Sequence, residues 1–120
     1  MSQKILFIDD DEDFVALVDY RLKSQNYEIS YASSGKEALK ILKEQKVDLV
    51  ILDRRLSDMN GYLIAKQLRN DEKTRKIPII LISGIRQGDE EEICDRFFLK
   101  PFDWKKLQDS IYSSKLNLRI

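Results

Sequence analysis

The sequence predicts an α/β domain in which helices cover both faces of a parallel sheet. Five short strand-like segments alternate with segments whose apolar residues recur at helical spacing. Three of the five are apolar throughout, which is typical of strands buried on both faces of a sheet. At 120 residues, the chain is long enough for one buried core, so we expect residues 1–120 to form a single domain.

The first half of the chain predicts two strand–helix units. Residues 5–8 (ILFI) form an apolar run, and residues 27–32 (YEISYA) alternate like a strand. Between them, four apolar residues share one helical face: Phe14, Leu17, Val18 and Leu22. Ser34 and Glu37 then have the spacing of a capping box, so the next helix begins there.

The second half repeats the alternation. Residues 49–52 (LVIL) and 78–82 (PIILI) are apolar strands, and residues 97–99 (FFL) are a short fifth strand. A helix is expected after Asn60-Gly61, and Asp103 is expected to cap the last one. These lengths and right-handed crossovers favour a doubly wound, flavodoxin-like sheet with strand order 2-1-3-4-5.

The fourth helix has little room. Only 13 residues, 84–96, separate the fourth and fifth strands, whereas a crossover with its helix needs at least about 10–12 residues. We therefore expect a shortened fourth helix of at most about two turns within residues 87–96. We further expect this segment to be mobile and its acidic run, residues 88–92, to be solvated.

Polar residues stand where the predicted strands end. Asp9 and Asp10 follow the first strand and Asp53 the third, while Ser83 and Lys100 follow the fourth and fifth. The carboxyl ends of parallel strands share one rim, and the ligand crevice lies where the strand order reverses. Three carboxylates near one ammonium favour a hard divalent cation, Mg²⁺ with Mn²⁺ as the alternative. Asp11 is expected to be a helix-start acid.

Composition excludes several classes of function. The net charge is zero, with 21 basic and 21 acidic residues, which gives no electrostatic reason to expect direct binding of nucleic acid or an anionic membrane. The single cysteine rules out an internal disulfide, and the absence of histidine rules out a resident imidazole. No apolar run approaches a signal peptide or a membrane span, so a cytoplasmic protein is expected.

Four motifs together resemble the receiver domain of two-component response regulators. These are FIDDDEDF after the first strand, VILDRRLSDMNGY around Asp53, IPIILISG at the fourth strand and FFLKPF at the fifth. Each motif is weak alone, but all four occur in order on the matching strand ends. The resemblance covers essentially the whole chain.

The resemblance implies a phosphoacceptor in a two-component or phosphorelay system. Asp53 would take a phosphoryl group from a phosphohistidine on a histidine kinase or a histidine phosphotransfer protein. Asp10, Asp53 and the backbone carbonyl of Arg55 would bind Mg²⁺ directly, with Asp9 acting mainly through water. Lys100 would offset phosphoryl charge.

The resemblance also implies a switch acting on a downstream effector protein. Ser83 would donate its hydroxyl to a phosphoryl oxygen, and Phe97 stands where the family has an aromatic that changes rotamer. A plain core role is the alternative for Phe97. The chain would catalyse its own phosphorylation and dephosphorylation without being a turnover enzyme. Because the fourth helix is short, the usual dimer through the face of helix 4, strand 5 and helix 5 is not expected.

Two other classes are compatible with parts of the sequence. A haloacid-dehalogenase-type phosphatase also places an aspartate nucleophile after its first strand, but it would want a threonine or similar residue where Asp13 stands, and a larger chain. A degenerate receiver would only bind partners. Acetyl phosphate with Mg²⁺ separates the three, because a receiver gains one labile phosphoryl group, a phosphatase turns over, and a degenerate module does neither.

Overall fold

The predicted sheet is present in the computed structural model, which describes residues 3–23, 25 and 27–115. Five parallel strands have the order β2-β1-β3-β4-β5, so the predicted fold class and strand order are confirmed. The strands are β1 (Gln3–Ile8), β2 (Tyr27–Ala32), β3 (Leu49–Asp53), β4 (Ile79–Ser83) and β5 (Arg96–Leu99). The helices are α1 (Glu12–Leu22), α2 (Gly35–Glu44), α3 (Gly61–Asn70), α4 (Glu90–Ile93) and α5 (Trp104–Lys115).

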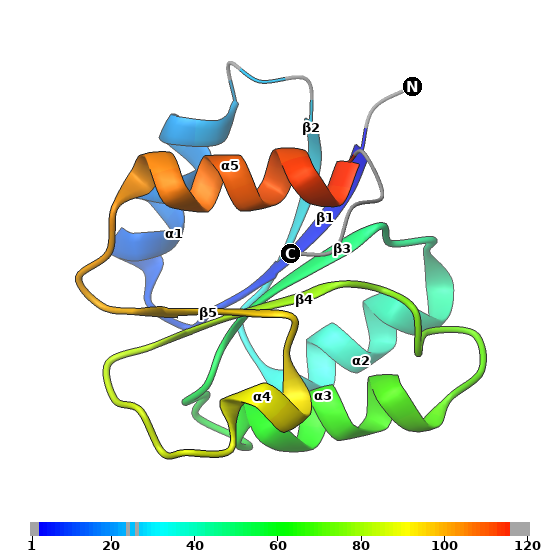
Figure 1. Ribbon diagram of the computed structural model, residues 1–120. Coiled ribbons are helices and arrows are strands. Elements are labelled where there is room, and N and C mark those ends of the chain that lie inside the picture. The colour runs from blue at the N-terminus through cyan, green and yellow to red at the C-terminus, as the bar shows by residue number, and fades with distance from the viewer. Residues whose placement is uncertain (1–2, 24, 26, 116–120) are drawn as a thin grey trace.

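The helices cover the sheet in two layers (Figure 1). Helices α1 and α5 pack on one face, over a core that includes Phe7, Ile51 and Leu107. Helices α2, α3 and α4 pack on the other, over a core that includes Leu52 and Ile64. Because both faces are covered, β3 and β4 are buried almost throughout, which explains their unbroken apolar sequences.

The helix starts follow from side-chain caps. Asp11 precedes α1 and its carboxylate accepts from the backbone N–H groups of the first turn, as expected for a helix-start acid. Ser34 caps α2 through the backbone N–H of Glu37, and Asn60 caps α3. The Lys105 N–H donates to the Asp103 carboxylate at the start of α5. These caps fix where each helix leaves the sheet rim.

Helix α4 has four residues, as the shortened crossover predicted. It packs on the core through Ile93, which is 2% exposed. The expectation that residues 88–92 are solvated is wrong for part of the run. Glu90 is 3% exposed and Asp89 is half-buried, because both carboxylates bind one arginine, whereas Glu91 and Glu92 are exposed.

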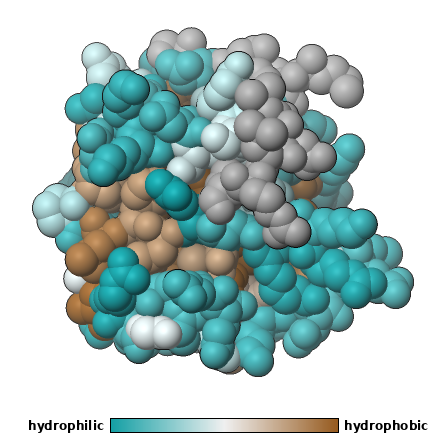
Figure 2. Space-filling view, viewed as in Figure 1, coloured by the Kyte–Doolittle hydropathy of each residue, from teal (hydrophilic) through white to brown (hydrophobic). Residues whose placement is uncertain are grey.

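An apolar area of the surface lies beside β5. Figure 2 shows this area where Figure 1 draws β5 below α5. A groove of about 550 Å³ runs there, with Phe97, Leu99 and Phe102 among its lining residues, and Leu99 is 44% exposed. Along the described part of the chain, no helix is both long and apolar enough to cross a membrane.

Candidate functional site

Three carboxylates meet at the carboxyl ends of β1 and β3. Asp9 and Asp10 directly follow β1, and Asp53 is the last residue of β3. The two strands are neighbours, with Ile8 opposite Leu52. One carboxylate oxygen from each of the three residues lies within 4.8 Å of the others. The topology thus brings together the three acids that the sequence predicted at this rim.

Asp9 is the most buried of these acids, at 2% exposure. Its Oδ1 accepts the backbone N–H of Asp11 at 2.9 Å, while its Oδ2 has no hydrogen-bond partner among the described residues. Burial raises the pKa of Asp9 to about 6, with the charge of Asp53 adding to the rise and the Asp11 hydrogen bond opposing it. Burial also raises the pKa of Asp53, and the positive charge of Lys100 opposes this rise. At least one acid therefore resists ionisation without a further cation.

These residues fit a hard divalent cation. The donors are carboxylate oxygens, which Mg²⁺ prefers in proteins. A buried oxygen without a hydrogen-bond partner, Asp9 Oδ2, is one that a cation or its water shell would satisfy. A cation would also offset the crowding of negative charge that raises the two pKa values.

Lys100 brings an ammonium group close to this cluster. Its Nζ lies 3.9 Å from Asp9 Oδ2 and 4.4 Å from the centre of the Phe14 ring. Its backbone N–H donates to the Ser83 carbonyl at 2.8 Å, which ties the ends of β4 and β5 together. The side chain is 30% exposed, so it can also meet a ligand from solvent.

Ser83 ends β4 and is 2% exposed. Its Oγ accepts the backbone N–H of Ile85 at 3.1 Å. In this contact the Ser83 oxygen is the acceptor, so the hydroxyl hydrogen can still be donated to another group. Gly84, the next residue, has no heavy atom within 4 Å of where a Cβ would stand, so the loop is open at this point.

Phe97 and Arg55 are the other two residues predicted for the site; Phe97 is the second residue of β5, opposite Leu81, and Arg55 follows β3 by two residues. Phe97 is half-buried and packs on the core of the α3 face, and the Arg86 guanidinium lies 4.7 Å from its ring centre. Both a core role and a mobile aromatic are compatible with this position. Arg55 is exposed, and its backbone N–H lies 3.4 Å from Asp53 Oδ1.

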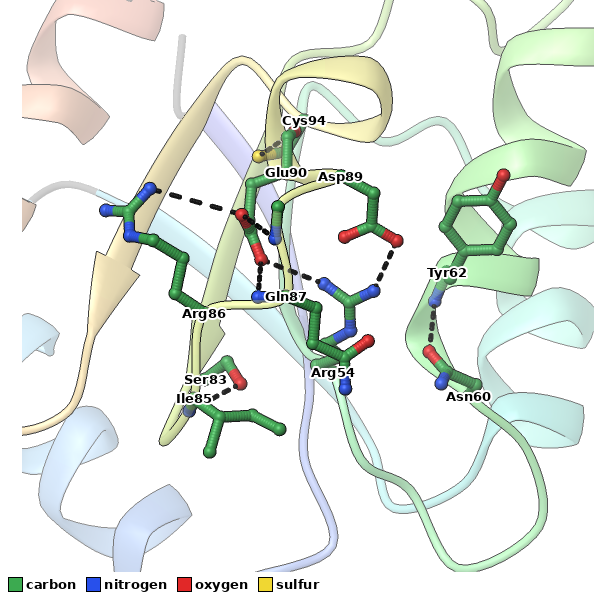
Figure 3. A network of polar contacts seen from close by, with 11 residues as sticks. Arg54, Asn60, Tyr62, Ser83, Ile85, Arg86, Gln87, Asp89, Glu90 and Cys94 are labelled. Carbon is green, nitrogen blue, oxygen red and sulfur yellow. Dashed lines mark hydrogen bonds and ion pairs between the residues drawn. The ribbon is translucent and has the colours of Figure 1, made fainter.

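Arg54 is the residue whose role the sequence did not predict. It follows Asp53 directly, yet it is 1% exposed and binds the carboxylates of Asp89 and Glu90 (Figure 3). The signal in the sequence was an arginine directly after an apolar strand. Its partners lie 35 and 36 residues further along the chain, and no local pattern indicates such a pairing.

Gly61, the first residue of α3, packs against the backbone at the end of β3. Its N–H donates to the Arg54 carbonyl at 2.6 Å. A Cβ at Gly61 would lie 2.7 Å from the Asp53 carbonyl oxygen, so only glycine lets the start of α3 approach the end of β3 this closely.

Comparison with known proteins assigns the chain to a family. A sequence model described as the response regulator receiver domain matches residues 5–112. The chain belongs to the response regulator receiver domain family. Response regulator PleD of Caulobacter vibrioides is 35% identical over 109 residues, covering 86% of this chain and 24% of PleD. Polar-differentiation response regulator DivK of Brucella ovis is 30% identical over 118 residues, covering 94% of this chain and 96% of DivK.

Solved receiver structures share the fold. The response regulator TrrA from Thermotoga maritima, crystallised in complex with Mg²⁺-BeF, has a TM-score of 0.83 and 29% identity, covering 93% of this chain and 98% of that one. The receiver resemblance drawn from the four motifs is thus confirmed, and the phosphatase alternative does not fit. The receiver spans about a quarter of PleD and nearly all of DivK.

Proposed function

We propose that this receiver is a phosphoacceptor whose Asp53 takes a phosphoryl group from a phosphohistidine of a partner, in a Mg²⁺-dependent transfer that switches partner binding. One observation carries the proposal: Asp9, Asp10 and Asp53 converge at one strand-end rim, with the Lys100 ammonium beside Asp9. The donor is a histidine kinase or a histidine phosphotransfer protein, and the reader is a downstream effector protein.

The chemistry is a displacement at phosphorus. An Asp53 carboxylate oxygen attacks, a phosphorus–oxygen bond forms, and the phosphorus–nitrogen bond to the donor imidazole breaks, leaving an acyl phosphate on Asp53. Asp53 must be ionised to attack, yet its burial raises its pKa. Lys100, whose charge opposes that rise, favours the reactive form and faces the incoming negative charge.

The residues that would hold Mg²⁺ are Asp10, Asp53 and the backbone carbonyl of Arg55, with Asp9 acting mainly through water. A bound Mg²⁺ would supply positive charge against the phosphoryl oxygens. The complex of TrrA with Mg²⁺-BeF supports this assignment by homology. A cation shared with Asp53 would offset the repulsion between the neighbouring carboxylates of Asp9 and Asp10.

The readout of phosphorylation belongs to Ser83 and Phe97. Ser83 would donate its hydroxyl to a phosphoryl oxygen, and Phe97 would change rotamer as that hydroxyl moves. The receiver catalyses its own phosphorylation and its own dephosphorylation. It does not turn over a separate substrate as an enzyme does. Cytoplasmic location and the absence of direct nucleic-acid binding stay predictions from composition.

Labelling by acetyl phosphate with Mg²⁺ tests the proposal. We expect one labile phosphoryl group per chain, and no labelling when Mg²⁺ is removed by chelation. Continuous release of inorganic phosphate in large excess over protein would instead indicate a phosphatase. Complete lack of labelling at saturating donor would indicate a degenerate receiver that only binds partners.

A further inference from the structure

The buried arginine next to the phosphoacceptor ties two loops of the rim together. Arg54 Nη2 donates to Asp89 Oδ2 at 2.6 Å, and Arg54 Nη1 donates to Glu90 Oε2 at 3.3 Å (Figure 3). The Arg54 and Glu90 side chains are 2% and 4% exposed. We call these three residues the Arg54 network. Water screens the buried pair of Arg54 and Glu90 little, whereas the Asp89 side chain is 31% exposed, so its pair with Arg54 is screened more.

Glu90 also binds the backbone of the loop between β4 and α4. Its carboxylate accepts the backbone N–H of Gln87 at 2.6 Å (Figure 3). It also accepts the backbone N–H of Gly88 at 3.0 Å. Gly88 has φ +96°, a conformation that favours glycine. The backbone of residues 87 and 88, which lie in the loop after Ser83, is therefore held by one carboxylate that is itself bound by Arg54.

Arg54 is a fixed anchor for this link. Its backbone N–H donates to the Ile82 carbonyl at 3.2 Å, and its carbonyl accepts the N–H of Gly61 at 2.6 Å. The backbone of Arg54 is thus bonded to β4 and to the start of α3, immediately after Asp53. The loop that follows Ser83 is thus connected, through Glu90 and Arg54, to the residue beside the phosphoacceptor.

The short α4 explains why such a link is needed. A four-residue helix cannot be stable on its own and offers only Ile93 as a buried apolar side chain. Its first residue, Glu90, and the residue before it, Asp89, are the two that bind Arg54. The Arg54 network therefore fastens the end of α4 that the helix itself leaves weakly packed.

We propose that Arg54 is a positioning residue for the phosphoryl transfer: by binding Asp89 and Glu90 it holds the β4–α4 loop, which begins at Ser83, the residue whose hydroxyl the proposed transfer uses. This inference rests on the proposed function. Arg54 does not touch the reacting atoms. It acts through the loop, and it couples the state of the site to α4.

The competing explanation is that the Arg54 network only stabilises the fold. Buried ion pairs are poor evidence for function, because removing one partner destabilises a protein whether or not the pair has another role. The test therefore needs readouts that separate the rate of phosphorylation from stability and from metal binding.

The central variant is Arg54→Met, with Arg69→Met as the matched control. Arg69 also bridges elements with a short ion pair, its Nη2 lying 2.7 Å from Asp95 Oδ2. It lies at the other end of the sheet, because Asp95 accepts the N–H of Ile79 at the start of β4. Three quantities are measured for each protein: the thermal midpoint, the Mg²⁺ dissociation constant by calorimetry, and the maximal labelling rate at saturating acetyl phosphate.

We expect Arg54→Met to lower the maximal labelling rate by about 10- to 100-fold, the loss that a small misplacement of a catalytic group causes. Its Mg²⁺ dissociation constant should stay at the wild-type value, because the Arg54 side chain contacts none of the proposed metal ligands. Arg69→Met should lose thermal stability and keep its labelling rate. In a double-mutant cycle, Arg54→Met and Asp89→Asn should be strongly non-additive, because they break one link.

Two milder variants keep the test decisive if Arg54→Met does not fold. Arg54→Lys retains the charge, but a lysine is a point charge and lacks the fork that reaches two carboxylates, so an intermediate rate is expected. Asp89→Asn should slow labelling in the same sense. Wild-type rates in all Arg54 and Asp89 variants that fold would overturn the inference, as would rates that fall only in proportion to Mg²⁺ affinity. A wild-type chain that takes up no phosphoryl group would overturn the proposed function and this inference together.

Discussion

Asp53 and Arg54 are consecutive residues whose side chains belong to different charge clusters. Asp53 lies with Asp9 and Asp10, where negative charge exceeds positive and burial raises two pKa values. Arg54 lies in a network in which its hydrogen bond holds the pKa of Asp89 below its usual range. Among the described residues, the first cluster lacks a positive charge equal to its negative charge, whereas the second contains the Arg54 guanidinium between its two carboxylates.

The lowered pKa of Asp89 makes a prediction about acid stability. Because the folded protein binds this proton less tightly than the unfolded chain, Asp89 adds stability above its ordinary pKa, and that stability is lost as pH falls through the folded value. The wild type should therefore lose more thermal stability than Asp89→Asn when the pH is lowered from about 5 to about 3. Thermal melts across this range measure it. Asp109→Asn, an exposed carboxylate in a surface pair, is the control. Parallel loss in the wild type and Asp89→Asn would contradict the role of Asp89.

At the scale of elements, the sequence was most informative where the pattern is local. Apolar strands, caps at Asp11 and Ser34, and the short α4 all follow from neighbouring residues or from chain length. The acids at the rim could be predicted because parallel topology brings strand ends together. The burial of Glu90 could not be predicted, because its carboxylate is satisfied by two backbone N–H groups of a loop without regular structure and by Arg54, which lies 36 residues away.

The short α4 predicts uneven protection from hydrogen exchange. Helix α4 has only four residues, and the bonds at its ends are Glu92 N–H to the Asp89 carbonyl and Cys94 N–H to the Glu90 carbonyl, so few bonds must break for it to open. The amides of residues 90–94 should exchange faster than those of α3, which has ten residues and a buried face. Exchange followed by mass spectrometry or NMR measures this. Equal protection in α3 and α4 would show that the crossover is as rigid as a full helix.

At the scale of the whole molecule, the acidic rim sets a balance between metal binding and stability. Three carboxylates that lie within 4.8 Å repel one another in the folded state and are separated by unfolding. A cation that binds only the folded receiver should offset this repulsion. At a free cation concentration of 100 times its dissociation constant, it should add about 2.7 kcal/mol to the free energy of unfolding.

Thermal melts with and without Mg²⁺ test this balance. Without metal, Asp10→Asn should raise the thermal midpoint, because it removes one of the repelling charges. With Mg²⁺, the wild type should gain more stability than Asp10→Asn, because the variant lacks a ligand. Glu72→Gln, an exposed position before β4 at the opposite rim, should behave as the wild type does. Identical responses of wild type and Asp10→Asn would argue against a shared cation site.

The most direct test of the central claim is to locate the phosphoryl group. The receiver is labelled with acetyl phosphate and Mg²⁺, and the acyl phosphate is reduced with borohydride, which converts a phosphorylated aspartate to homoserine that peptide mass spectrometry can place. We predict homoserine at position 53 alone, and none in Asp53→Asn. Homoserine at Asp9, Asp10 or any other aspartate, or undiminished labelling of Asp53→Asn, would contradict the assignment of Asp53 as the phosphoacceptor.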